Sequence, residues 1–119
     1  MKSQWITYKD KKILFADYSD FTDDSQSLFS EVNDVNEIIM QQPEGSLLLL
    51  MDTRNSIASV EVISYFKQTA LKTKKYIAKI AVIGITGVRK ILFDTIVQFS
   101  GLNAAIFENL EEGKEWLAE

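Results

Sequence analysis

Two short, uninterrupted apolar segments constrain the fold of this chain more than any other feature. LLLLM covers residues 47–51 and IAVI covers residues 80–83, and a loop-forming stretch follows each of them. Segments of this length and composition are typical of strands covered on both faces, as in a parallel sheet. A helix-like pattern follows each strand, so the order of elements predicts parallel strand pairs joined by right-handed crossovers.

The spacing of apolar residues around these strands predicts the helices. A first helix starts at residues 22–24, where Thr and Asp supply capping groups, and it ends before Pro43. A second helix begins near Ser59, and the last one follows Asn109, three residues before a Glu in capping-box spacing.

Two further strands precede these elements, and one lies just before the last helix. WITY and KILFADY are rich in aromatic and β-branched residues and flank a short turn, and NAAIF at 103–107 is a last short strand. Apolar residues make up 46% of the chain and charged residues 25%, which is ordinary for a globular domain. We therefore expect residues 1–119 to form a single α/β domain, a mixed sheet of about five strands with about four helices packed on it.

The composition removes the usual catalytic and metal-binding side chains. The chain has no Cys and no His, so it lacks a thiolate nucleophile, a triad base and the commonest transition-metal ligands. We expect a protein that is not an enzyme and that uses no cofactor. An enzyme with Asp52 or Asp17 as its base is a third reading.

An acidic stretch near the N-terminal strands invites a calcium-binding reading, which fails on spacing. Counting an EF-hand loop from Asp20 puts Ser25 where the loop needs Gly and Ser27 where it needs an aliphatic residue. Helix capping accounts for these acids more simply, so we expect no metal site.

No segment has the pattern of a membrane or secretion signal. The first residues, MKSQWITYKDKK, are polar, and LLLLM is far shorter than the roughly 20 residues that span a bilayer. We expect a cytoplasmic protein without stable membrane insertion.

The segment VIGITGVRK, residues 82–90, resembles several phosphate-binding or nucleic-acid-binding loops without matching one. Its glycines are Gly84 and Gly87, which fit neither GxxxxGK[ST] nor GxGxxG. It also departs from the GxxG clamp of KH domains, whose middle residues are basic, and the net charge of −4 argues against a nucleic-acid partner. A turn between strand and helix, with Thr86 as the cap, is the structural interpretation.

The helix after this turn occupies residues 88–100 and ends at Gly101. Arg89 and Lys90 lie in its first turn, where positive charge opposes the helix dipole, so they are candidates for contacts with an anionic ligand or partner. The expected buried stripe of this helix consists of Val88, Ile91, Leu92, Ile96 and Phe99.

Charge is distributed unevenly along the chain. Every charged residue between Lys12 and Arg54 is acidic, whereas Glu61 is the only acid between Arg54 and Lys90. This asymmetry is compatible with two solvated faces or with a surface that meets a partner. A homodimer formed through the terminal strands is also open, since those strands offer sheet edges.

In a parallel sheet, ligands and partners usually meet the loops beyond the carboxyl ends of the strands. An Arg beside Asp and Asn suits hydrogen bonding to an anion or to a partner backbone. The candidate binding residues in these loops are Asp17, Ser19, Asp52, Thr53, Arg54, Asn55, Thr86 and Arg89.

A series of segments gives the chain a family resemblance, in the order ILFADYS, LLLLMDTRNSIASVEV, KIAVIGITGVRKILFDTIVQFSG, a short strand and the acidic terminal helix ending in WL. It resembles bacterial SpoIIAA-like proteins of the STAS/SEC14 type over nearly its whole length. The resemblance implies a small mixed sheet and a non-catalytic binding or regulatory module. Its anti-sigma-factor antagonists are phosphorylated on a Ser, but here Arg54 stands at that place and Asn55 replaces the following Gly, which argues against the phosphorylation switch.

Two hypotheses of function follow. The leading one is a non-catalytic, regulatory STAS-like module that binds a protein partner through the loop edge. The alternative is a small-molecule binder, for a nucleotide or lipid anion, that uses Arg54, Arg89 and the helix N-terminus after Gly87.

Overall fold

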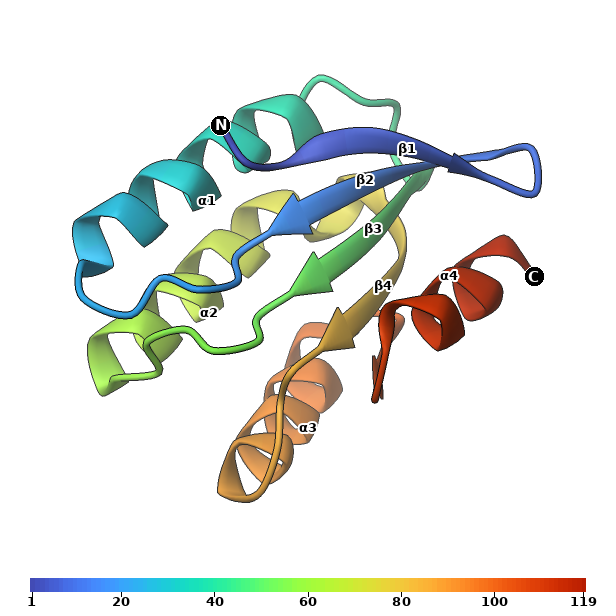
Figure 1. Cartoon of the computed structure of the whole chain (residues 1–119). Helices are drawn as coiled ribbons and strands as arrows, with labels where there is room; N and C mark the ends of the chain where they lie inside the picture. Colours follow the sequence, from blue (N-terminus) through green and yellow to red (C-terminus); the bar gives the residue numbers. More distant parts are fainter.

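A five-stranded mixed sheet forms the centre of the computed structural model (Figure 1). The structure describes the backbone of residues 1–119 and every side chain except those of Leu92, Ile96, Phe99 and Ser100. The strands are β1 (Gln4–Tyr8), β2 (Lys11–Asp17), β3 (Leu47–Asp52), β4 (Ile77–Ile83) and β5 (Ala104–Phe107). Their order in the sheet is the order in the chain, with β1 antiparallel to β2 and all other neighbours parallel.

The described backbone also contains four α-helices and one short 3₁₀ helix, so the fold-class prediction is confirmed. The helices are α1 (Ser25–Ile39), α2 (Val60–Thr73), α3 (Val88–Ser100) and α4 (Leu110–Ala118), and the 3₁₀ helix η1 is Lys74–Tyr76. None of the described helices combines the length and the apolar character needed to cross a bilayer.

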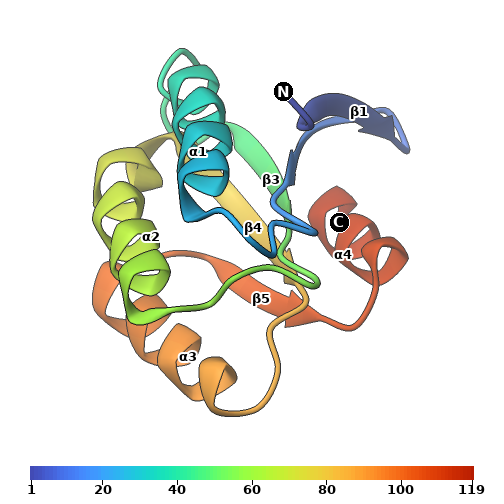
Figure 2. The same ribbon diagram turned by 60° about the vertical axis from the view of Figure 1, so that its left-hand side comes forward.

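The strand order determines which face each helix covers. From β2 to β5 every crossover steps one strand in the same direction, and right-handed crossovers then place α1, α2 and α3 on one face. Figure 2 shows these three helices on one side of the sheet and α4 on the other. The sheet therefore has a thick layer on one face and a single nine-residue helix on the other.

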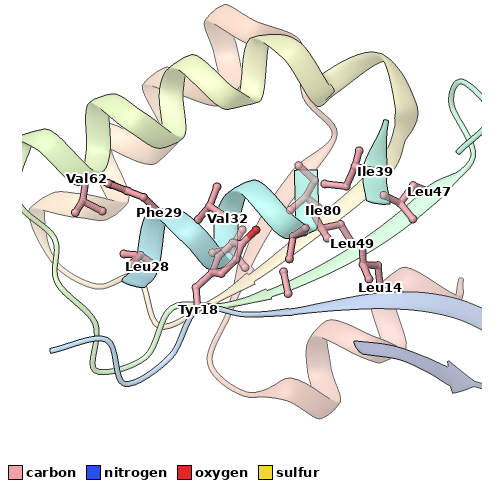
Figure 3. Close-up of a cluster of buried hydrophobic side chains, with 13 residues drawn as sticks. Leu14, Tyr18, Leu28, Phe29, Val32, Ile39, Leu47, Leu49, Val62 and Ile80 are labelled. Carbon is pink, nitrogen blue, oxygen red and sulfur yellow. The ribbon is translucent and has the colours of Figure 1, made fainter. Parts of the chain in front are cut away.

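Side chains that alternate along the strands fill two separate cores. The larger core lies under α1, α2 and α3 and includes Leu14, Leu49 and Val82 (Figure 3). The smaller core lies under α4, where Leu50 and Leu117 are almost completely buried.

Capping groups mark the helix ends largely as the sequence predicts. Asp24 caps α1 by accepting from the backbone N–H of Gln26 at 2.9 Å, and Asn109 caps α4 by accepting from that of Glu112 at 2.9 Å. Gly101 ends α3 in the left-handed conformation, with φ 72°.

Two predictions for α3 are wrong. Gly87, with φ 63°, occupies the cap position without a side-chain hydrogen bond, so Thr86 lies one residue too early to cap the helix. Val88 and Ile91 are 73% and 67% exposed, whereas Phe93 packs against the larger core and Val97 lines a cavity on the same side of the helix. The rest of the predicted stripe, Leu92, Ile96 and Phe99, falls outside the described side chains.

Candidate functional site

The structure brings the three predicted loops together at the carboxyl edge of the parallel strands. The backbone N–H of Tyr18 donates to the carbonyl of Asp52 at 2.9 Å, which joins the loop after β2 to the end of β3. The N–H of Thr53 donates to the carbonyl of Ile83 at 2.8 Å, which joins β3 to β4. Sequence reasoning therefore located this edge correctly, because parallel strands all end there.

An internal ion pair occupies the centre of the edge. The guanidinium of Arg54 donates to the carboxylate of Asp52 through Nε at 3.0 Å and through a terminal nitrogen at 2.8 Å. The Asp52 side chain is only 3% exposed, so the pair satisfies a buried carboxylate. The hydrogen bonds that Arg54 donates to Asp52 raise the pKa of Arg54 above its usual value, and the negative charge of Asp52 raises it as well. The pair holds the loop after β3 in shape, and Arg54 is committed to it.

The other predicted polar residues also bond mainly within the protein. The hydroxyl of Ser19 donates to Asp17 at 2.6 Å, and the hydroxyl of Thr53 donates to the Ile83 carbonyl at 2.8 Å. The amide of Asn55 donates to Asp20 at 2.9 Å. The contacts of Thr53 and Asn55 connect one loop to the next, and the contact of Ser19 lies within its own loop. Most of the candidate binding residues therefore build the edge.

A cavity of about 180 Å³ lies beside this edge, between the sheet, α2 and α3. Its walls are mainly apolar, and they include Met51, Ile63, Phe66, Val82 and Phe93. Small residues leave the space open, namely Ala58, Ala70, Gly84 and Ala104. Sequence reasoning missed the cavity, although small residues on otherwise apolar faces were the available signal.

A second cavity of about 50 Å³ continues beneath α2 toward α1. The two cavities share six described lining residues, Tyr18, Met51, Phe66, Ala70, Ile80 and Leu102. Shared walls make the two spaces neighbours along one apolar path.

Arg89 supplies a cation at the larger cavity. It lines the cavity while remaining exposed, and among the described side chains it has no hydrogen-bond or ion-pair partner. Of the predicted binding residues, Thr53 and Arg89 line this space, whereas Thr86 lies exposed in the loop after β4 and is not among its described lining residues.

Exposed apolar side chains accompany the same edge. Val60 is 85% exposed at the start of α2, and Val88 and Ile91 are exposed in the first turn of α3. Both helices begin at the carboxyl edge, so these side chains lie on its solvent side.

Asp24, in the acidic stretch after β2, caps helix α1. Asp24 accepts from the Ser27 hydroxyl at 2.6 Å as well as from the backbone of α1, and these bonds lower its pKa. Among the described residues, no three His, Cys, Asp or Glu side chains gather closely enough to hold a metal ion.

The strand order, the three helices on one face and the single helix on the other define a class of protein, the small α/β domains with a SpoIIAA-like fold. The chain has this fold, as its resemblance implied. It is similar to an uncharacterised protein of the DUF3478 family from Shewanella loihica PV-4, whose crystal structure has a SpoIIAA-like fold. The TM-score is 0.66 and the identity 18%, over 97% of this chain and 91% of the other. No protein-family model and no curated protein matches the chain.

Proposed function

We propose that the protein binds, without catalysis, a small amphipathic anion whose apolar body fills the cavity between the sheet, α2 and α3. The observation that carries the proposal is an apolar cavity with an unpartnered cation, Arg89, among its described lining residues. Apolar walls with a few placed polar groups are the common pattern of ligand sites. An anionic head at Arg89 would gain a charge-assisted hydrogen bond, while the body would leave water.

The size of the cavity narrows the class of ligand. At about 180 Å³ it is comparable to engineered apolar cavities of roughly 150 Å³ that bind benzene. It is smaller than the roughly 300 Å³ at which pockets for drug-sized molecules begin. A short alkyl chain or one ring fits this space better than a nucleotide does, so medium-chain carboxylic acids are the first ligands to test.

The test is a titration with decanoate that is monitored through ¹H–¹⁵N NMR spectra of the protein. We expect shifts concentrated at the amides of α2 and α3. Arg89→Glu should weaken binding about tenfold, because it replaces attraction by repulsion at the head group. Ala70→Leu should weaken it as well, because the added side chain fills space that the ligand needs.

Lys90→Glu is the matched control, since it makes the same change of charge one residue away from the cavity lining. Binding that responds equally to Arg89→Glu and Lys90→Glu would mean that only net charge matters. Decanoate that leaves the spectra unchanged, or that binds Ala70→Leu as tightly as the wild type, would contradict the proposal.

A second candidate function is a regulatory interaction with a protein partner at the carboxyl edge. The exposed side chains of Val60, Val88 and Ile91 favour it, because apolar residues gathered at one edge suit a protein interface. The test is native mass spectrometry of the protein purified gently from its own cells.

A stoichiometric second protein that is lost from a Val88→Asp/Ile91→Asp double variant would support the partner. Leu71→Asp is the control, since Leu71 is also exposed but lies late in α2, away from this edge. A bound small molecule without a second protein would favour the first candidate. A spectrum that contains only the mass of this chain would count against a stable protein partner.

A further inference from the structure

The hydroxyl of one nearly buried side chain stands out among the polar groups of the larger core. Tyr18 is 2% exposed, and its ring lies 5.4 Å from the ring of Phe66, between their centroids. Figure 3 shows its oxygen pointing into the cluster of apolar side chains below α1. The backbone of Tyr18 is fully used, since its N–H donates to Asp52 and its carbonyl accepts from the Ser56 hydroxyl.

The phenolic oxygen of Tyr18 has no hydrogen-bond partner among the described residues, in contrast to its backbone groups. None of the hydrogen bonds among the described side chains uses it. Among the described residues no side-chain nitrogen or oxygen is both fully buried and without a hydrogen-bond partner, so this hydroxyl keeps contact with accessible space. Tyr hydroxyls in apolar surroundings usually find a partner. Tyr18 also lines both cavities, so its hydroxyl lies where a molecule in that space can reach it.

The surroundings of Tyr18 define which group it would accept. The shared walls are otherwise apolar, formed by Met51, Phe66 and Ile80 among others. Glu31 already places a negative charge nearby, and burial together with that charge raises the pKa of Tyr18. The phenol therefore remains neutral, and a charged ligand group beside it would be strongly disfavoured.

We propose that the ligand carries a second, uncharged oxygen on its apolar chain and that this oxygen bonds to the Tyr18 hydroxyl while the anionic head lies at Arg89. This inference rests on the proposed function and specifies its ligand class, the hydroxy- or oxo-carboxylic acids of medium chain length. Tyr18 is then the residue that selects oxygenated chains over plain ones, because an unoxygenated chain leaves its hydroxyl without a partner.

The experiment compares two proteins and two kinds of ligand. Decanoate and a set of hydroxy- and oxodecanoates, with the oxygen moved along the chain, are titrated against the wild type and Tyr18→Phe. At least one oxygenated acid should bind the wild type about 3- to 10-fold more tightly than decanoate, as one added hydrogen bond predicts. Tyr18→Phe should abolish that preference, so that this variant binds the oxygenated acid no more tightly than decanoate.

Tyr65→Phe is the matched control, because Tyr65 donates its hydroxyl to Asn33 and is not among the described residues that line either cavity. It should leave the preference intact. The inference is overturned if no oxygenated acid is preferred by the wild type, or if the preference survives in Tyr18→Phe. Decanoate binding would stand in both of those cases. Failure of every acid to bind any variant would overturn the proposed function and the inference together.

Discussion

A single buried carboxylate fastens the N-terminal segment to α1. Glu31 is 6% exposed, and its two oxygens accept from the backbone N–H groups of Lys2 at 3.0 Å and Ser3 at 2.9 Å. Burial alone would raise the pKa of Glu31, but the hydrogen bonds from Ser3 and Lys2 outweigh burial and lower the pKa. The charged form is therefore favoured in the folded protein.

We expect Glu31→Gln to lower the free energy of unfolding by about 1–2 kcal/mol at neutral pH, because a neutral amide accepts these hydrogen bonds more weakly. The folded-state pKa lies below the ordinary value of 4.5. The stabilisation is therefore present above pH 4.5 and is lost as the pH falls through the lowered pKa. Urea denaturation at pH 7 and at pH 3 measures the difference between variant and wild type.

Glu37→Gln is the control for this prediction, since Glu37 is exposed on the same helix. It should change the unfolding free energy little at either pH. A difference for Glu31→Gln that is as large at pH 3 as at pH 7 would show that the carboxylate charge does not provide the stabilisation.

At the scale of elements, the loop between β4 and α3 depends on one close approach. Gly84 has φ 98°, and a Cβ at this position would lie 2.6 Å from the backbone nitrogen of Arg54. The first glycine of the VIGITG segment is therefore needed for contact with the loop after β3, and no phosphate is required to explain it. The second, Gly87, has a positive φ with open space around it.

Gly84→Ala should destabilise the protein by about 3 kcal/mol or more, because it combines an unfavourable φ with a backbone clash. Gly101→Ala is the control, since Gly101 has a similar positive φ of 72° but nothing within 4 Å of the added Cβ. That change should cost only about 1 kcal/mol. Thermal unfolding measures both variants, and equal losses would show that the approach to Arg54 is unimportant.

The terminal helix α4 illustrates how a short element covers a sheet face. A Cβ on Gly113 would lie 3.0 Å from Leu50 Cδ1, so the helix backbone approaches the sheet closely there. Two tertiary contacts secure the helix further. Lys79 donates to the carbonyl of Trp116 at 3.0 Å, and Lys9 pairs with Glu115 at 2.7 Å. Packing and these contacts stabilise a helix that is too short to be stable alone.

At the scale of the whole molecule, the two faces of the sheet have different consequences. The α4 face is closed by one helix, whereas the opposite face carries three helices in a row. The cavities lie on that second face, beneath α2 and between α2 and α3. Small side chains such as Ala58 and Ala70 line this space.

Much of the architecture could be predicted from local pattern. The apolar segments at 47–51 and 80–83 indicated buried parallel strands, and Asp24, Asn109 and Gly101 marked helix ends through chemistry that acts within a few residues. The roles of Val88 and Ile91 could not be read in this way. Their helical spacing suits burial, but the rotation of α3 about its axis is set by what it packs against.

The sequence by itself determined the order of strands and helices, the parallel pairing and the edge at which the loops meet, because periodicity, caps and crossover handedness are local or topological rules. Only the tertiary structure decided that Arg54 pairs with Asp52, that Gly84 lies against Arg54 and that Tyr18 and Arg89 line an apolar cavity. These features depend on distances between segments far apart in the chain. No spacing along one segment encodes such distances, since they emerge only when every side chain is packed at once.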